Sequence, residues 1–281
     1  MCEVFEMMEK YERLLSIIRL ANRAAVAFSG GVDSSLLCYA AVRALGEGAL
    51  AITVVSPMLP KTEIACAQRM AALVGIAHVL IDEDEIDEEV AANPADRCYH
   101  CKKREFGAIA RAAADRGVLT VFDGSNVDDE GDYRPGLRAL SELKIASPLR
   151  EAGLGKAEIR ELSRRFDLPT WDKPAFACLA SRIPYGEEIN REKLARIEGA
   201  EAALRGAGFV QFRVRCHGDI ARIEVAPEER RRFFDEVLLD DVSGKIKALG
   251  FLYVAFELEG YRMGSLNRAL ALAVGAPGTP A

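Results

Sequence analysis

AVAFSGGVDSSLL, residues 25–37, is the stretch that decides the fold of this chain. Its first four residues are apolar and predict a short buried parallel strand, and the spacing from Asp33 onward predicts an amphipathic helix. Between them, Gly30 and Gly31 let the backbone turn sharply and come close to a ligand. The N–H groups at the start of the helix then favour an anion. The stretch therefore predicts a strand–loop–helix unit with a phosphate ligand.

The polar side chains of this loop indicate what kind of phosphate it binds. Ser29, Ser34 and Ser35 can donate hydroxyl hydrogen bonds, and the carboxylate of Asp33 suits Mg²⁺. A kinase-type loop, GxxxxGK[ST], contains a lysine that is missing here. The lysine-free loop resembles the PP-loop of the ATP pyrophosphatases, which attack the α-phosphate of ATP and release pyrophosphate. A glycine-rich turn without a ligand is the competing interpretation.

Length and composition predict a soluble cytoplasmic protein of two domains. The chain has 281 residues, half of them hydrophobic and 28% charged, and no apolar run reaches the eighteen or so residues of a membrane span. Its acidic, amphipathic beginning does not resemble a signal peptide. Seven cysteines in such a chain favour metal binding or catalysis over structural disulfides. The net charge of −6 argues against a large nucleic-acid surface.

Strand and helix patterns alternate after the loop, which predicts an α/β fold with a parallel sheet. Strands are expected at 50–56, 78–81 and 118–122, and helices at 62–74, 102–114 and 156–166, after a first helix at 3–20. Ligands bind at the carboxyl ends of parallel strands, so the loop, Ser56 and Gly124 should share one edge of the sheet. The predicted ATP-binding residues are Phe28, Ser29, Gly30, Gly31, Asp33, Ser34, Ser35, Ser56 and Gly124.

The second half of the chain has a different pattern. We expect a PP-loop domain at 1–170, a functional linker at 171–186, and a C-terminal substrate-binding domain at 187–281. The linker, WDKPAFACLASRIPYG, lacks a clear period but holds a cysteine and an arginine. The last part reads as a helix at 191–205, strands at 209–216 and 220–225, a helix opened by Pro227, and a strand at 251–258. This order predicts a small α+β domain.

Cys98 and Cys101 form a Cys-x-x-Cys motif just before the helix predicted at 102–114. A redox pair is one interpretation, although the thioredoxin context is missing. A zinc site would need four ligands, and His100 is awkwardly spaced for the same ion. An iron–sulfur cluster would take a third thiolate from Cys178 and keep one iron without a protein ligand. The motif alone leaves zinc and iron–sulfur equally open.

Six stretches in this order, SGGVDSS, NPADRCYHCKK, DGSNVDDEGDYRPG, WDKPAFACLASRIPYG, FRVRCH and LEGYRMGSLN, resemble the LarE family. These are ATP-dependent sulfur transferases that build the nickel-pincer nucleotide cofactor of lactate racemase. The resemblance implies that ATP adenylates the carboxylates of pyridinium-3,5-biscarboxylic acid mononucleotide, and that sulfur then displaces AMP to give a thiocarboxylate. Some relatives sacrifice one cysteine as the sulfur source. Others deliver sulfide from a [4Fe-4S] cluster held by three cysteines.

The resemblance also implies the roles of individual residues. Cys178 matches the sacrificial cysteine, and Cys98 and Cys101 complete the cluster set, so the chain resembles the cluster-bearing branch and would need a sulfide source. Ser181 and Arg182 lie beside the sulfur donor and join the three cysteines as the predicted catalytic residues. Arg213 and Arg215 alternate along a strand and so share one face, and Arg262 follows the last strand. Arginine binds phosphate through paired hydrogen bonds, and the resemblance implies that these three bind the substrate phosphate. Arg134 is a further candidate for a phosphate, with a surface salt bridge as the alternative.

Three functions are compatible with the sequence. A cofactor-building sulfur transferase, expected to form a homo-oligomer, is the leading hypothesis. A PP-loop tRNA thiolase is the alternative, but the acidic balance and the missing basic domain argue against it. A nucleotide-binding or cluster-carrying regulator without turnover is the third. Asp128, Asp129 and Asp132 either help to hold Mg²⁺ or form an acidic loop.

Overall fold

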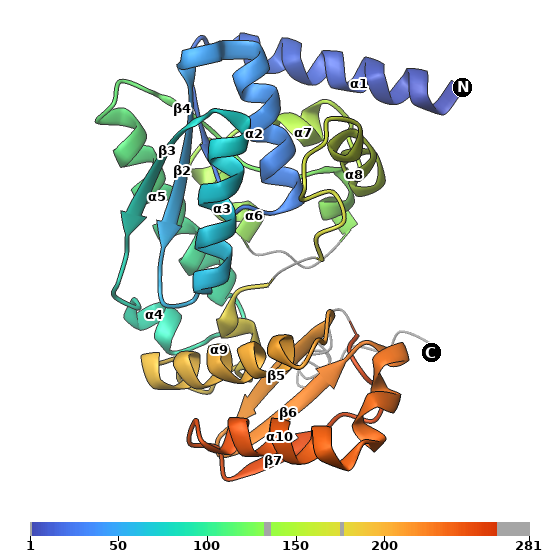
Figure 1. The fold of residues 1–281 in the computed structure, drawn as a ribbon. Helices are drawn as coiled ribbons and strands as arrows, with labels where there is room; N and C mark the ends of the chain where they lie inside the picture. Colours follow the sequence, from blue (N-terminus) through green and yellow to red (C-terminus); the bar gives the residue numbers. More distant parts are fainter. Residues whose placement is uncertain (1, 132–135, 175–176, 263–281) are drawn as a thin grey trace. The chain divides into compact units, whose positions relative to one another are not determined.

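The computed structural model describes residues 2–131, 136–174 and 177–262. It divides the chain into two compact units (Figure 1). The first unit comprises Met1–Glu85 and Asp96–Phe176, and the second comprises Ile86–Ala95 and Ala177–Ala281. Each unit has its own sheet.

The first unit is built on a parallel sheet. Strands β1 (Ala24–Ala27), β2 (Ala49–Val55), β3 (Ala77–Asp82) and β4 (Thr120–Phe122) pair in the order β3-β2-β1-β4, and all three pairings are parallel. The predicted α/β fold class with a parallel sheet is confirmed. The carboxyl ends of β1 and β4 are neighbours, because Val26 pairs with Phe122.

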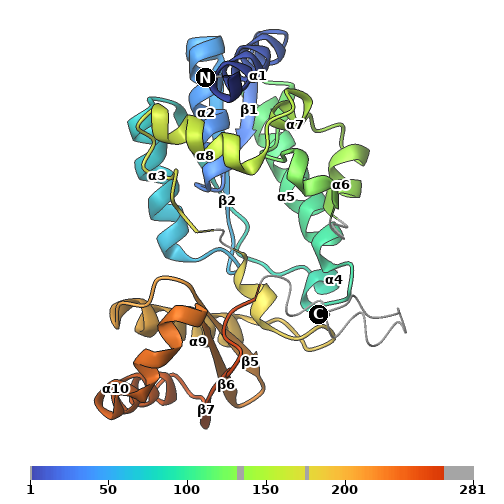
Figure 2. The same cartoon turned by 90° about the vertical axis from the view of Figure 1, so that its right-hand side faces the viewer.

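Helices cover both faces of this sheet. Side chains that alternate along β1 point to opposite faces, so Val26 packs in one hydrophobic cluster and Ala25 in the other. Figure 2 shows α5 and α6 on the right of the unit, and α2, α3 and α8 on its left. The helices are α1 (Cys2–Arg19), α2 (Val32–Leu45), α3 (Lys61–Val74), α5 (Arg97–Ala114), α6 (Gly136–Glu142), α7 (Pro148–Glu151) and α8 (Lys156–Arg165).

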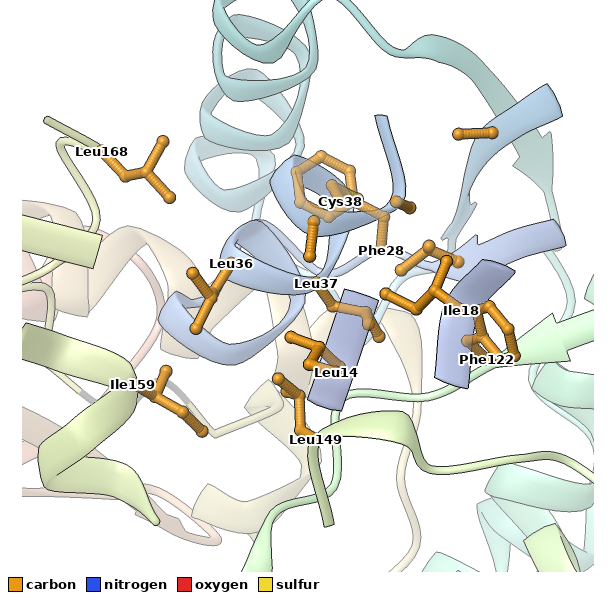
Figure 3. Packing of buried hydrophobic residues seen from close by; sticks show 14 of the residues in the cluster. Leu14, Ile18, Phe28, Leu36, Leu37, Cys38, Phe122, Leu149, Ile159 and Leu168 are labelled. Carbon is orange, nitrogen blue, oxygen red and sulfur yellow. The ribbon is translucent and has the colours of Figure 1, made fainter. Parts of the chain in front are cut away.

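The larger cluster holds the PP-loop helix in place. Leu36 and Leu37 of α2 are fully buried, and they pack with Leu14 of α1, Leu149 of α7 and Ile159 of α8 (Figure 3). Each such side chain contributes about 1.5–3 kcal/mol when it leaves water. The loop that precedes α2 is therefore carried by a rigid core.

The sequence predicted that the Cys-x-x-Cys motif lies just before a helix, and this prediction is wrong. Helix α5 begins at Arg97, so Cys98 and Cys101 stand on its first turns. The residue before it, Asp96, is a typical helix-starting residue, and Tyr99 is buried on the helix. These signals place the start of the helix before the motif.

Two predicted strands also begin later than expected, for a shared reason. Gly117 and Gly208 have positive φ angles of 70° and 81°, and the next residue of each, Val118 and Phe209, donates its N–H back to the preceding helix. In both turns a glycine in the left-handed conformation ends the helix, as is common at helix C-termini. Val118 and Phe209 therefore belong to helix ends rather than to strands.

The second unit is a small α+β fold, as predicted. Strand β5 (Phe212–His217) pairs antiparallel with β6 (Ile220–Val225), and β6 pairs parallel with β7 (Tyr253–Phe256). The helices are α4 (Glu88–Ala91), α9 (Arg191–Gly206) and α10 (Glu236–Lys247), with 3₁₀ turns at Leu179–Arg182 and Pro227–Phe234. The helix expected from Pro227 is thus a 3₁₀ turn followed by α10, which Asp235 caps through its side chain.

The segment Ile86–Ala95 joins the second unit through Asn93. The side-chain amide of Asn93 is fully buried and donates to the carbonyl oxygens of Pro184 and Glu187 at 2.7 and 3.0 Å. The backbone carbonyl oxygen of Asn93 accepts from the N–H of Gly186 at 2.9 Å. These bonds fasten the end of the linker region to a part of the chain ninety residues earlier, a contact that the local sequence pattern does not indicate.

Candidate functional site

A pocket of about 380 Å³ lies in the first unit, where β1 and β4 end. The loop after β1 provides Ser29 and Asp33, and the segment after β4 provides Asp123 and Gly124. The pocket is therefore at the carboxyl edge of the parallel sheet, where ligands bind in α/β folds. Its other lining residues are Ala27, Phe28, Ser34, Cys98, Lys102, Glu105, Phe106, Ser125, Asp129, Gly136, Leu137 and Leu140.

The PP-loop has a conformation that requires glycine. Gly30 has a φ angle of +70°, and a Cβ atom there would lie 3.0 Å from the backbone nitrogen of Ala67 on α3. The hydroxyls of Ser29 and Ser34 lie 3.1 Å apart across the loop. The loop is thus packed closely against α3, and its serines gather at the start of α2.

Gly124 brings the end of β4 against the start of α2. A Cβ atom at Gly124 would lie 3.3 Å from the backbone nitrogen of Ser34. A side chain at this position would crowd the N–H groups at the start of α2, which carry the partial positive charge of the helix dipole. Glycine keeps this end of the helix accessible to an anion.

Asp33 is the centre of a charged network beside the pocket. Its carboxylate accepts from the ammonium of Lys156 at 2.5 Å and from the side-chain amide of Asn126 at 3.1 Å. Asp128 accepts from the backbone N–H of Lys156 at 2.6 Å, and Asp129 accepts from the N–H of Asn126 at 3.0 Å. A carboxylate is the type of ligand that Mg²⁺ prefers, and the Lys156 ammonium is of the type that binds phosphate.

The predicted ATP-binding residues divide into two groups. Phe28, Ser29, Asp33, Ser34 and Gly124 line the pocket. Those outside its lining are Gly30, Gly31, Ser35 and Ser56, of which Ser35 is fully buried and Ser56 half-buried.

Sequence reasoning did not single out several polar residues of this site. Asp123 accepts from the hydroxyl of Ser147 at 2.5 Å and also from that of Ser125, which fixes the segment after β4. Lys102 and Glu105, on α5, are joined at 3.1 Å on the pocket wall. The signal for Asp123 and Ser125 was available, because both follow a buried strand directly, whereas Lys156 comes from a helix far along the chain.

Cys98 and Cys101 belong to the first unit, and Cys178 belongs to the second. Both Cys98 and Cys101 are half-buried on α5, and Cys98 lines the pocket. Cys178 is exposed at the beginning of a 3₁₀ turn. In the described part of the chain, no group of three or more His, Cys, Asp or Glu side chains is arranged to hold a metal ion. The thiols are of the type that iron–sulfur clusters take as ligands.

Arg182 holds the Cys178 turn from beneath. Its guanidinium is fully buried and donates to the carbonyl oxygens of Ala177 and Cys178 at 2.6 and 3.0 Å, and to the hydroxyl of Ser181 at 2.9 Å. Two further bonds, at 2.8 and 3.1 Å, join it to the buried carboxylate of Glu201. Arg182 therefore positions the backbone that carries Cys178.

Arg215 supports the same turn from the sheet. Its guanidinium forms two bonds with Glu224, at 3.0 and 2.8 Å, and donates to the carbonyl oxygen of Ser181 at 2.8 Å. Ser181 in turn donates its hydroxyl to the carbonyl oxygen of Cys178 at 2.8 Å. Two buried Arg–Glu pairs thus grip one short turn.

The remaining predicted phosphate residues lie in different environments. Arg213 shares a sheet face with Arg215 and is buried, and its guanidinium lies 4.9 Å from the ring of Tyr261. Burial lowers the pKa of Arg213. Arg262 is exposed and pairs with Glu259 at 3.3 Å. Arg134 lies outside the described residues, as does Asp132.

Comparison with known proteins identifies the family. Residues 19–106 match the asparagine synthase family. The chain is 36% identical, over 94% of its length and 96% of the relative, to the pyridinium-3,5-bisthiocarboxylic acid mononucleotide synthase of Lactiplantibacillus plantarum. The chain belongs to the LarE family. An uncharacterized protein of Synechocystis is 45% identical over 93% of this chain and 98% of its own.

Membership confirms the predicted enzyme class, an ATP-dependent sulfurtransferase of the PP-loop type. A GMP synthase of Aeropyrum pernix is 28% identical over 65% of the chain but only 39% of its own length. This more distant likeness spans less of the chain than the LarE match. Within the described ranges, no helix is both long and apolar enough to cross a membrane.

Proposed function

We propose that this enzyme activates the carboxylates of pyridinium-3,5-biscarboxylic acid mononucleotide with ATP and converts them to thiocarboxylates for the nickel-pincer nucleotide cofactor of lactate racemase. Its observational support is that Cys98 lines the same pocket as Asp33 and Gly124. The Cys98 thiol and the PP-loop thus line one pocket in the first unit. The family relative named as the corresponding synthase supports the choice of substrate.

Adenylation begins the proposed reaction. A carboxylate oxygen attacks the α-phosphorus of ATP, and the bond to pyrophosphate breaks. The start of α2 and the ammonium of Lys156 would stabilise the phosphates, and Asp33 would hold Mg²⁺. The products are an acyl adenylate and pyrophosphate.

Sulfur transfer completes the proposed reaction. Hydrosulfide attacks the acyl carbon, AMP leaves, and one proton is released as the thiocarboxylate forms. Cys98, Cys101 and Cys178 would hold a [4Fe-4S] cluster, which when bound supplies sulfide from an iron without a protein ligand. The arginine face of β5 would take the substrate phosphate, since arginine binds phosphate through paired hydrogen bonds.

Sacrifice of Cys178 is the alternative sulfur source, because this thiol is exposed. The experiment that separates the two uses anaerobically reconstituted protein. The cluster proposal expects about four irons per chain, loss of iron and activity in Cys98→Ser, Cys101→Ser and Cys178→Ser, and an unchanged Cys178 mass after turnover. Cys216→Ala, which changes a buried strand cysteine, is the control and should keep its iron. Loss of the elements of H₂S from Cys178, with full activity in Cys98→Ser, would replace the cluster by the sacrificial mechanism.

A further inference from the structure

Lys173 of the linker lies behind the PP-loop, in a contact that the proposed reaction does not use. Its ammonium donates to the carbonyl oxygen of Gly30 at 2.9 Å and to the carboxylate of Glu63 at 2.8 Å, and lies 3.2 Å from the sulfur of Cys66. The side chains of Lys173 and Glu63 are only 18% and 11% exposed. All of these residues belong to the first unit.

The backbone around Lys173 is fixed independently. Arg160 of α8 donates to the carbonyl oxygens of Trp171 and Lys173 at 2.6 and 2.8 Å. The linker is therefore held at its backbone by α8 and at its ammonium by the loop and α3. The linker backbone and the loop are thus joined to the same core of the first unit.

The ion pair between Lys173 and Glu63 affects the electrostatic field at the proposed ATP site. Glu63 is a mostly buried carboxylate close to a loop that must accept a triphosphate. An unpaired buried carboxylate is costly, and its field would oppose a nearby anion. Lys173 neutralises Glu63 and at the same time fixes Gly30, whose positive φ angle and close approach to Ala67 leave the loop little room.

We propose that Lys173 is a positioning residue that holds the PP-loop in its ATP-binding conformation and makes ATP binding depend on the seated linker. Lys173 precedes Cys178 by only five residues in the sequence. The residue that contacts the ATP loop and the cysteine therefore belong to the same linker. This inference rests on the proposed ATP site. It adds a link between ATP binding and the segment that carries sulfur chemistry.

The test measures binding of an ATP analogue whose α–β bond cannot be cleaved. Lys173→Met should weaken it about ten- to a hundredfold, as expected for the loss of a charged hydrogen-bond donor, while binding of the pyridinium mononucleotide stays unchanged. Lys10→Met is the matched control. Lys10 also bonds a glutamate, Glu158, at 2.8 Å in the first unit, but it does not contact the PP-loop. This control should bind the analogue like the wild type.

A second variant distinguishes positioning from general damage. Glu63→Gln removes the buried charge, so Lys173→Met/Glu63→Gln should bind the analogue more tightly than Lys173→Met alone. If Lys173 only stabilised the fold, the folded fraction of Lys173→Met would bind the analogue with wild-type affinity, and that result would overturn the inference. No gain in affinity from Lys173→Met to the double variant would overturn it as well. Failure of the wild-type protein to bind the analogue would overturn both the inference and the proposed function.

Discussion

The charges beside the pocket of the first unit and those at the Cys178 turn of the second unit are buried to different degrees. In the first unit, Asp33 and Lys156 stand beside a pocket, and the Lys156 side chain is still 38% exposed. In the second unit, Arg182 and Glu201 are almost completely buried and bond to each other. Charges beside a pocket can exchange their partners for a ligand, whereas the desolvated pair can only be broken at a large cost.

This difference indicates a division of labour. The first unit keeps polar groups at the edge of a sheet, where a nucleotide can reach them. The second unit uses two Arg–Glu pairs to fix the turn that begins at Cys178. The comparison predicts that charge changes in the first unit mainly alter chemistry, and that those beneath the turn mainly alter stability.

The largest expected effect is that of Asp33→Ala. Without this carboxylate Mg²⁺ loses a proposed ligand and Lys156 loses its partner, so release of pyrophosphate from ATP should fall by about four orders of magnitude, or about 5.5 kcal/mol. The helix α2 is held by its buried leucines, so the unfolding temperature should stay nearly the same. Retained formation of AMP and pyrophosphate would remove Asp33 from the site.

Breaking the buried pair should give the opposite result. Arg182→Met leaves the Glu201 carboxylate buried, where it still accepts from the backbone N–H of Val214 at 3.1 Å, and should cost about 3–5 kcal/mol of folding free energy. Urea unfolding of the variant measures this loss. The exposed pair Arg164–Glu161 provides the control, because Arg164→Met should cost less than about 1 kcal/mol. Equal losses in the two variants would contradict the burial argument.

The sequence predicted the local features of the site and missed its long-range contacts. The strand–loop–helix unit could be predicted because Gly30, Gly31 and the apolar periods are local signals. Lys156 and Lys173 could not, since each meets the loop only after more than a hundred residues of chain have folded. Arg182 was predicted beside the sulfur donor, but its burial under the turn depends on Glu201 of α9, which no local pattern indicates.

Arg213→Ala tests whether the arginine face of β5 also binds a ligand. The loss of a charged donor to phosphate should weaken binding of the pyridinium mononucleotide by about 1.5–3 kcal/mol, which is about ten- to a hundredfold. Binding of ATP should not change, because Arg213 belongs to the second unit. Calorimetric titration with each ligand measures both values. An equal loss for the two ligands would contradict a separate phosphate site.

The smallest expected effect concerns two histidines, one in each unit. His78 lies 2.8 Å from the hydroxyl of Thr53, which donates to the carbonyl oxygen of Phe28 at 2.5 Å, and burial lowers the pKa of His78. Burial also lowers the pKa of His217 in the second unit, where the Arg222 guanidinium adds to the effect. Both rings therefore resist protonation in the folded state.

The sign of the pH dependence follows from these lowered pKa values. An unfolded histidine has a pKa of about 6.5, so above that value each ring is neutral in both states and folding carries no protonation cost. As the pH falls below about 6.5, the unfolded chain takes up the protons first and stability decreases. His78→Gln should reduce the stability lost between about pH 7.5 and pH 5.5 by less than about 1.4 kcal/mol, the equivalent of one pKa unit. Urea unfolding of the wild type, His78→Gln and His217→Gln at both pH values measures this loss of stability. The carboxylates are common to all three proteins, so they contribute equally. An unchanged loss in a variant would therefore show that its histidine is not the titrating group.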